Sequence, residues 1–558
     1  MGSNIIISGT SFLLPKNEVW SVLGPTNKII FSNYGDWRSP IKKCKKNEYL
    51  VFVVFISDLY GISSASNKND SKAVLDLVKV FLKTVEQHLK KLSSPTIVTI
   101  SSWRPESIIR LVGNKNYSEK IYNILTKGLN VLKTSYPNLY LFDLDKQLGY
   151  QGLAKAFDNR NWYLAHCRLS MNGLNTLAQC LAKIIERIKS PAKKVLVLDC
   201  DNTLWGGVVS EDGLSGITLG QDGLGSAFVD FQYVAKRLKR EGILLALCSK
   251  NNEEDVWEVF QKHQSMILKK NDIAAHKINW KDKVQNLIEL SSELNLDLNS
   301  FVFWDDNPLE RDKIKKTIPQ VLTVEPSKNV TEWPEHLAGM NCFAKFNITN
   351  EDKKKTNQYR MRAKFTKDIK KEIDEVSFLK SIKLKANAIP INESTIKRAS
   401  QLSMKTNQFN LRTVRYAESE IEKLYNNENS FLVNLNDVYG DHGLVGLICA
   451  KTIDTKFIFL ENFLMSCRVL GRHLEAWMFN KIVQNAKKNN YEYIIAEYIP
   501  TKKNVIAKKC LHEHGFDLIT DFNNKNLEKI NLKNYVKNGK VYIASVKEIK
   551  IPFVEVYE

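Results

Sequence analysis

The stretch KVLVLDCDNTLWGG, residues 194–207, joins the pattern of a buried strand to a pair of carboxylates. Its aliphatic run ends at Asp199, and Asp201 and Thr203 follow at alternate positions. A strand that delivers an Asp-x-Asp pair to the open end of a parallel sheet is suited to phosphate chemistry, because one carboxylate can attack phosphorus while the other moves a proton. Taken alone, the stretch is also compatible with a strand followed by an Asx-rich turn.

Three later segments place polar residues at comparable positions. Ser249 ends the strand-like run ILLALCS, and its hydroxyl can hold a phosphoryl oxygen. Lys283, in NWKDKVQNLIEL, begins a helix and can neutralise a phosphate and an attacking carboxylate, with Lys281 as the competing lysine. Asp305 and Asp306 end FVFWDD, and carboxylates from two strand ends can share a hard cation such as Mg²⁺. Each segment alone also fits a turn, a cap or a solvated side chain, but their order favours one phosphate site.

Periodicity predicts a multidomain α/β chain. Strand-like runs alternate with helical patterns in residues 1–190 and again in residues 194–345, which indicates two parallel, doubly wound sheets. Sites in such sheets lie beyond the carboxyl ends of the strands, where Asp199, Ser249 and Asp305 are expected. The helices expected in these two units are Ser71–Leu92, Tyr117–Ser135, Ser226–Glu241, Glu253–Met266 and Lys281–Leu294.

The rest of the chain has a different character. Residues 349–375 are dense in charge with few apolar anchors, which predicts an exposed, partly helical connector. Residues 376–558 mix strands with helices, as in an α+β domain. Four segments are therefore expected, three of them with their own cores.

The bulk composition limits the class of protein. Of the 558 residues, 43% are hydrophobic, which is enough for several packed cores. No apolar run reaches the ~18 residues of a membrane span, and the N-terminus has no signal-peptide pattern, so a cytoplasmic protein is expected. Nine dispersed cysteines without a CxxC pair indicate free thiols. The net charge of +20 fits an acidic partner protein, whereas the spread of the lysines does not favour nucleic acid.

The order of the polar segments resembles the haloacid dehalogenase-like (HAD-like) phosphohydrolase superfamily. The resemblance implies that Asp199 is the nucleophile, forming an aspartyl-phosphate, and that Asp201 is the acid/base. It further implies a Mg²⁺ site at Asp199, Asp201, Asp305 and Asp306, and the family spacing favours Lys283 as the balancing cation. The phosphate ligands that it implies are Thr203, Ser249, Asn251 and Lys283.

The spacing of these segments leaves no room for a large cap over the site. No sizeable domain is inserted between Thr203 and Ser249, or between Lys283 and Asp305. An uncapped site resembles those superfamily members that act on macromolecules, since a small metabolite more often needs a lid to exclude water. A protein-borne substrate is therefore expected.

A narrower resemblance covers about residues 160 to 520. The segments LDCDNTLWGGVVSEDG, CSKNNEEDV, NWKDKVQNL, FVFWDDNPLER, SCRVLGRHLEAWM and AEYIPTKKN are similar to the FkbH-like subfamily. This resemblance implies an enzyme that removes phosphate from 1,3-bisphosphoglycerate and loads the glyceryl unit onto an acyl carrier protein as a thioester, in polyketide or related biosynthesis. The alternatives are a HAD phosphatase with another phosphorylated substrate and a non-catalytic carrier-binding scaffold.

Cys200 lies between the two aspartates of the first segment. An acyl phosphate is a good acyl donor to a thiolate, so one hypothesis is that Cys200 takes the glyceryl group before the carrier does. The opposing interpretation is that Cys200 points away from the site, because side chains alternate along a strand and buried cysteines are common core residues.

The C-terminal unit resembles GNAT-type N-acetyltransferases. In LMSCRVLGRHLEAWM a strand precedes Arg468-x-x-Gly471-x-His473 and a helix, an arrangement in which backbone N–H groups cradle a pyrophosphate. The resemblance implies that Arg468, Gly471 and Arg472 bind a phosphopantetheine or CoA arm. His473 departs from the family pattern, which has a small residue at this position.

The N-terminal unit resembles SGNH-hydrolase-like α/β domains. Ser8 in ISGTSF corresponds to a nucleophile position, and His166 lies in HCRLSMNG. The Asp-x-x-His of an active site is missing, so a non-catalytic scaffold or docking domain is expected.

Overall fold

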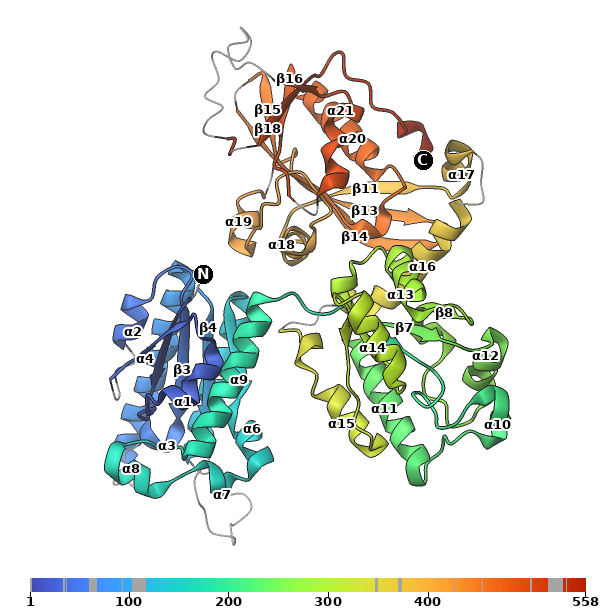
Figure 1. Ribbon diagram of the computed structural model, residues 1–558. Helices are drawn as coiled ribbons and strands as arrows, with labels where there is room; N and C mark the ends of the chain where they lie inside the picture. Colours follow the sequence, from blue (N-terminus) through green and yellow to red (C-terminus); the bar gives the residue numbers. More distant parts are fainter. Residues whose placement is uncertain are drawn as a thin grey trace. The chain divides into compact units, whose positions relative to one another are not determined.

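The computed structural model divides into two compact units (Figure 1). One comprises Met1–Ala192 with Ala344–Phe346, and the other comprises Lys193–Phe343 with Asn347–Glu558. Three separate sheets lie within them, so the predicted multidomain α/β class is confirmed. The structure describes residues 3–33, 36, 38–59, 68–92, 94–102, 117–346, 350–369, 374–425, 427–453, 455–501, 504–519, 535–537 and 539–557.

The first unit is built on a five-stranded parallel sheet in the order β2-β1-β3-β4-β5. The strands are β1 (Asn4–Gly9), β2 (Lys28–Phe31), β3 (Tyr49–Phe55), β4 (Thr96–Ser101) and β5 (Leu139–Asp143). The helices are α1 (Asn17–Trp20), α2 (Arg38–Lys43), α3 (Ile56–Leu59), α4 (Lys68–Lys91), α5 (Tyr117–Ser135), α6 (Leu144–Gln151), α7 (Leu153–Ala156), α8 (Asn159–Ala165) and α9 (Met171–Lys189). Alternate strand residues face opposite layers: Ile5 and Ile7 pack with α1 and α9, and Ile6 packs with α4 and α5.

The central domain, which opens the second unit, has a parallel sheet in the order β10-β9-β6-β7-β8. Its strands are β6 (Val195–Leu198), β7 (Leu244–Ser249), β8 (Ile273–Ile278), β9 (Phe301–Trp304) and β10 (Leu322–Thr323). Its helices are α10 (Val209–Gly216), α11 (Gly223–Arg240), α12 (Glu253–Lys262), α13 (Lys283–Leu294), α14 (Pro308–Thr317) and α15 (Trp333–Ala338). Leu196 and Leu198 face the layer of α11, α12 and α15, whereas Val195 and Val197 face α13 and α14, so the sheet is doubly wound around a central β6.

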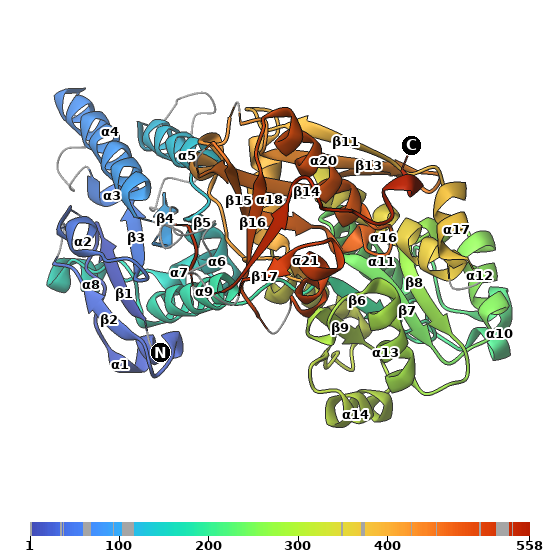
Figure 2. The same ribbon diagram turned by 90° about the horizontal axis from the view of Figure 1, so that it is seen from above.

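The C-terminal domain contains an eight-stranded mixed sheet, whose main path runs β11-β13-β14-β15-β16-β18-β17, with β12 paired to β15. Its strands are β11 (Lys385–Pro390), β12 (Phe409–Asn410), β13 (Phe431–Asp437), β14 (Gly440–Thr452), β15 (Phe457–Met465), β16 (Tyr493–Tyr498), β17 (Asp517–Leu518) and β18 (Lys540–Ser545). Its helices are α17 (Glu375–Ser381), α18 (Ile396–Lys405), α19 (Glu418–Glu422), α20 (Leu474–Lys488) and α21 (Cys510–Glu513), with 3-10 turns η6 (Cys467–Val469) and η9 (Val554–Val556). The parallel pair β15–β16, joined through α20 and set in an otherwise antiparallel sheet, is the arrangement expected of a GNAT-like domain (Figure 2).

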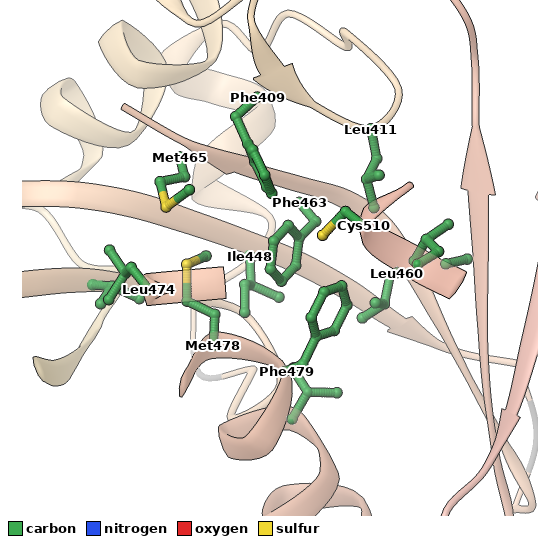
Figure 3. Packing of buried hydrophobic residues seen from close by; sticks show 14 of the residues in the cluster. Phe409, Leu411, Ile448, Leu460, Phe463, Met465, Leu474, Met478, Phe479 and Cys510 are labelled. Atoms are coloured by element: carbon green, nitrogen blue, oxygen red, sulfur yellow. The ribbon is translucent and has the colours of Figure 1, made fainter. Parts of the chain in front are cut away.

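Helix α20 supplies much of the core of this domain. Its apolar face, with Leu474, Met478 and Phe479, packs on Ile448 and Phe463 of the sheet (Figure 3). The Phe463 and Phe479 rings are stacked, with centroids 4.3 Å apart.

The expected exposed connector is instead a packed helix, α16 (Asn350–Ile369). Tyr359 contributes to the core of the central domain, and Phe365 contributes to the core of the C-terminal domain. Asp352 is 1% exposed and lies against Gly242, at the end of α11. The prediction of an exposed segment is wrong, because its few apolar residues fall on the faces that meet the two domains.

Within the described residues, no helix combines the length and apolarity that a membrane span requires.

Candidate active site

Asp199, Asp305 and Asp306 bring their carboxylates together at the carboxyl edge of the central sheet. One oxygen of each lies within 4.8 Å of the others. The cause is strand pairing, which sets Leu198 of β6 beside Trp304 of β9, and the Asp199 amide donates to the Trp304 carbonyl (3.1 Å). Asp199 and Asp305 are therefore neighbours at the ends of adjacent parallel strands.

Lys283 lies between two of these carboxylates. Its Nζ is 2.9 Å from Oδ2 of Asp199 and 2.6 Å from Oδ2 of Asp305, and its side chain is 4% exposed. It is the first residue of α13, and the preceding Asp282 caps that helix by accepting the Val284 amide. Burial by itself lowers the pKa of the ammonium, but the carboxylates of Asp199 and Asp305 outweigh it and raise the pKa above its usual value. The competing Lys281 is exposed.

The residues fit a hard divalent cation. Oδ1 of Asp199 is buried and has no hydrogen-bond partner among the described residues. Burial, and then the charge of Asp199, raises the pKa of Asp305 to about 7, and the same causes raise the pKa of Asp306. Three carboxylates facing one ammonium leave an excess of negative charge, which a divalent cation with oxygen ligands would balance.

Asp201 lies beside the site but outside the carboxylate cluster. Its Oδ1 accepts from Nε1 of Trp205 (2.9 Å) and the Val209 amide (3.1 Å), and its Oδ2 accepts from Nδ2 of Asn251 (2.7 Å). These three donors hold the Asp201 carboxylate apart from the cluster of Asp199, Asp305 and Asp306, and a role of Asp201 in holding the metal stays a prediction. Burial raises the Asp201 pKa despite the three hydrogen bonds, which suits a carboxyl group that delivers a proton.

The expected phosphate ligands lie at the same edge of the sheet. Thr203 is fully buried, and its hydroxyl is 3.5 Å from Oδ1 of Asp306. Ser249 is 1% exposed at the end of β7. The side-chain N–H of Asn251 donates to Asp201, so Asn251 orients the Asp201 carboxyl group.

Cys200 faces the hydrophobic layer of α11 and α12, together with Leu196 and Leu198. It is fully buried, and burial raises the pKa of its thiol well above the usual value. Cys200, two residues beyond the end of β6, therefore packs in this apolar layer, with its thiol in hydrogen-bond contact with the Ser249 side chain. This placement argues against a role as a glyceryl-carrying thiolate.

Two residues that position the carboxylates of the site were not predicted from the sequence. Arg311 donates from Nη1 to the backbone oxygens of Asp305 (2.9 Å) and Asp306 (2.6 Å), which fixes the turn that carries both carboxylates. Trp205, fully buried, donates to Asp201. The available signals are Arg311 one helical turn after the Asp-Asp-Asn-Pro turn, and Trp205 four residues after Asp201.

In the C-terminal domain, two of the expected arm-binding residues, Arg468 and Arg472, have buried side chains, whereas Gly471 is exposed. Arg472 is fully buried, with Nε 2.8 Å from Oδ2 of Asp437 and its guanidinium 3.8 Å from the centre of the Phe365 ring. Arg468 is 7% exposed, and Gly471 has a φ of +84°. The Arg472 side chain is enclosed by protein, so it does not reach a bound arm, while the expected contact through backbone N–H groups stays a prediction.

In the first unit, Ser8 and His166 both take part in hydrogen bonds that join neighbouring segments of the chain. The Ser8 hydroxyl donates to the Asp36 carbonyl (3.2 Å) and accepts from Ser32. The His166 carbonyl accepts from the hydroxyl of Ser11 (2.9 Å).

Comparison with known proteins supports a phosphatase-like fold for the central domain. No family model matches the chain, and a search of curated proteins finds no match. Among solved structures, the chain is similar to the N-terminal part of the protein BF1531 from Bacteroides fragilis, which contains a phosphatase domain complexed with Mg. The two are 26% identical with a TM-score of 0.53, and the match covers 62% of this chain and 95% of that chain.

Shorter matches lie among acetyltransferases. A GNAT-family acetyltransferase from Staphylococcus aureus Mu50 is 15% identical with a TM-score of 0.22, covering 29% of this chain and 99% of that chain. An acetyltransferase from Streptococcus agalactiae 2603 is 16% identical with a TM-score of 0.22, covering 29% and 98%. The strand order of the C-terminal domain is the evidence for its GNAT-like fold. The central domain is a HAD-like phosphatase domain, and the protein is an enzyme.

Proposed function

We propose that the protein is a Mg²⁺-dependent HAD-type enzyme that dephosphorylates 1,3-bisphosphoglycerate and transfers the glyceryl unit to the thiol of an acyl carrier protein. The observation that carries the phosphate chemistry is the free, buried Oδ1 of Asp199 beside Lys283, Asp305 and Asp306. The substrate and the carrier follow from the resemblance of the same segments to FkbH-like proteins.

In the phosphoryl step, Asp199 attacks phosphorus and the bond to the departing sugar-acid oxygen breaks, while Asp201 gives that oxygen a proton. Water then attacks the aspartyl-phosphate, Asp201 takes the proton of the water, and inorganic phosphate leaves. Lys283 neutralises charge on Asp199 and on the phosphoryl oxygens. A Mg²⁺ ion held by Asp199, Asp305 and Asp306 would supply further positive charge to those oxygens.

In the acyl step, a thiolate attacks the carbonyl carbon of the acyl phosphate, the carbon–oxygen bond breaks, and phosphate leaves as a thioester forms. The burial of Cys200 favours the thiol of the carrier as this nucleophile. The remaining phosphate ester at the third carbon is then the substrate of Asp199. Two phosphates are released for each glyceryl thioester.

The open edge of the sheet supports a protein-borne substrate. Between Thr203 and Ser249 the chain forms only the short α10 and the layer helix α11, and between Lys283 and Asp305 only α13 and a 3-10 turn. No separate domain is inserted in either connection, which favours a substrate carried by a protein over a small metabolite that needs a lid.

The test is the intact mass of a purified carrier protein incubated with the full chain, 1,3-bisphosphoglycerate and Mg²⁺. The wild-type chain is expected to give a glyceryl adduct, whereas Asp199→Asn gives a phosphoglyceryl adduct or none. Asp230→Asn, at an exposed position on α11, is the matched control and is expected to behave as wild type.

Two other results would favour the alternatives. Phosphate release without any carrier adduct would favour a HAD phosphatase with a different substrate. Carrier binding with neither adduct nor phosphate release would favour a scaffold.

A further inference from the structure

The N-terminus of α20 is where a GNAT-like fold would bind the pyrophosphate of a cofactor, because helix amides and the helix dipole favour an anion there. In this protein His473 fills that position. Its ring stacks on Phe553, with centroids 3.8 Å apart and planes 6° apart. Its Nε2 is 3.1 Å from Oε1 of Glu375, and its Nδ1 is 3.7 Å from Oε1 of Glu475. Two carboxylates therefore lie on either side of the His473 ring, next to the end of the helix that a pyrophosphate would approach.

Other parts of the domain contact the turn before α20. The hydroxyl of Tyr557 donates to the carbonyl of Arg472 (2.7 Å), and burial raises the pKa of this phenol well above its usual value. A Cβ atom at Gly471 would lie 3.5 Å from the Phe365 ring, so the ring of α16 packs directly on the turn. The C-terminal segment and α16 thus both contact the strand-to-helix turn, while Gly471 stays exposed.

A second place for a cofactor arm is the gap between β15 and β16. These strands pair in parallel from Phe457 and Tyr493 only as far as Leu460 and Ala496. Strands that stop pairing leave main-chain donors and acceptors, with which an extended, amide-containing arm could form hydrogen bonds.

Residues 409–411 of the chain form hydrogen bonds with these main-chain groups. The Leu411 amide donates to the Phe463 carbonyl (3.1 Å) in β15, and the Leu411 carbonyl accepts from the Ile499 amide (2.9 Å), which follows β16. Figure 3 shows Phe409 and Leu411 beside Phe463, in the same buried cluster. Residues 409–411 are therefore joined by hydrogen bonds to both sides of the gap.

Buried polar contacts hold this segment in place. Arg412 donates from Nη1 to the Glu461 carbonyl (2.9 Å) and lies 2.7 Å from the carboxylate of Glu497, which is fully buried. Asn504, also fully buried, donates to the Asn410 carbonyl (2.9 Å). Displacing residues 409–411 would take the Asn410 carbonyl away from Asn504 and would pull on the adjoining Arg412, which is paired with Glu497, at a large cost.

We infer that the C-terminal domain does not take an acyl-CoA or a phosphopantetheine arm, because residues 409–411 fill the gap between β15 and β16 and the His473 ring, stacked on Phe553, stands at the N-terminus of α20. The domain is an acetyltransferase-like fold that no longer uses the cofactor of that fold. This inference does not depend on the proposed function, since it concerns a different domain and a different ligand.

The test is binding of CoA and of ADP to the full chain, by isothermal titration calorimetry at physiological salt. ADP is the control for charge, because a chain of net charge +20 attracts any anionic nucleotide. CoA is expected to bind no more tightly than ADP. Hydrogen exchange at the Leu411 and Ile499 amides is expected to stay slow and unchanged when CoA is added.

Saturable CoA binding with a Kd below ~100 µM that ADP does not match would overturn the inference. Faster or slower exchange at Leu411 in the presence of CoA would also overturn it. The variant Phe553→Ala is expected to melt at a lower temperature without gaining CoA binding, because residues 409–411 still fill the gap. CoA binding gained by that variant would contradict the closure of the gap.

Discussion

Nζ of Lys283 lies 2.6 Å from Oδ2 of Asp305, and neither side chain is more than 4% exposed. The same ammonium reaches Asp199 on the neighbouring strand, so one buried cation holds two carboxylates that would otherwise repel each other. The pair is therefore part of the stability of the domain as well as of its chemistry.

The first prediction concerns the variant Lys283→Met. Removing the ammonium leaves two buried carboxylates without their partner, so we expect a loss of about 3–5 kcal/mol in the free energy of unfolding without metal. Mg²⁺ should restore part of that loss because it supplies the missing charge, whereas phosphatase activity should stay at least ~100-fold low. Thermal melting with EDTA and with Mg²⁺ measures this. An equal fall in stability in both conditions would contradict a shared carboxylate site.

The second prediction is a pH dependence of Mg²⁺ binding. The pKa of Asp305 is raised to about 7, above that of a free aspartate. Between about pH 4 and pH 7 the folded protein without metal therefore keeps a proton on Asp305 that the unfolded chain has lost. The contribution of this group to stability therefore decreases as pH rises from about 4 to about 7. Mg²⁺ must displace that proton, so the Mg²⁺-induced increase in Tm should grow between about pH 5.5 and pH 8.

The control for this pH dependence is Asp305→Asn, which has no proton to displace. In that variant the effect of Mg²⁺ should be small and should vary less with pH than in the wild-type chain, since only Asp306 keeps a raised pKa. A Mg²⁺-induced Tm shift in the wild-type chain that is constant across the range would rule out competition between the metal and the Asp305 proton.

The third prediction separates Cys200 from the chemistry. Cys200→Ala should load a carrier protein as well as the wild-type chain, while losing on the order of 1 kcal/mol of stability from a small cavity. Cys248→Ala is the matched control, since Cys248 is equally buried on the other face of the sheet. Carrier mass spectrometry and thermal melting distinguish the outcomes. Loss of loading by Cys200→Ala at unchanged Tm would restore Cys200 as the glyceryl carrier.

The parallel sheets and the strand-end carboxylates could be predicted because hydrophobic runs and turn residues are local features. The positions of Asp199 and Asp305 in the site could be predicted from one rule, that sites in parallel sheets lie beyond the carboxyl ends of the strands. Strand β8 is harder to predict, because its alanines interrupt the aliphatic pattern and His276 and Lys277 make its second half polar.

The orientation of side chains required the structure. Sequence alone does not decide which face of β6 carries Cys200, or that Arg472 turns inward toward Asp437. The packing of α16 also depends on partners far away in the chain, so its few apolar residues give little local signal. In each case a tertiary contact decides what the local pattern leaves open.

The last prediction concerns the junction between α11 and α16. Gly242 ends α11 with a φ of +84°, and its amide and that of Ile243 donate to the carbonyls of Lys239 (2.9 Å) and Leu238 (3.0 Å), as in a Schellman motif. A Cβ at this position would lie 2.6 Å from the Cβ of Asp352.

Gly242→Ala combines backbone strain with a steric clash, so we expect a loss of about 2–4 kcal/mol in the free energy of unfolding and faster hydrogen exchange in the first turns of α16. The control is Gly223→Ala, at a φ of +56° with no neighbouring atom within 4 Å, where strain alone should cost about 1–2 kcal/mol. Urea unfolding measures the first effect, and exchange measured by mass spectrometry measures the second. If both variants lose the same stability and α16 exchanges at the wild-type rate, the contact between Gly242 and Asp352 does not hold α16 against the central domain.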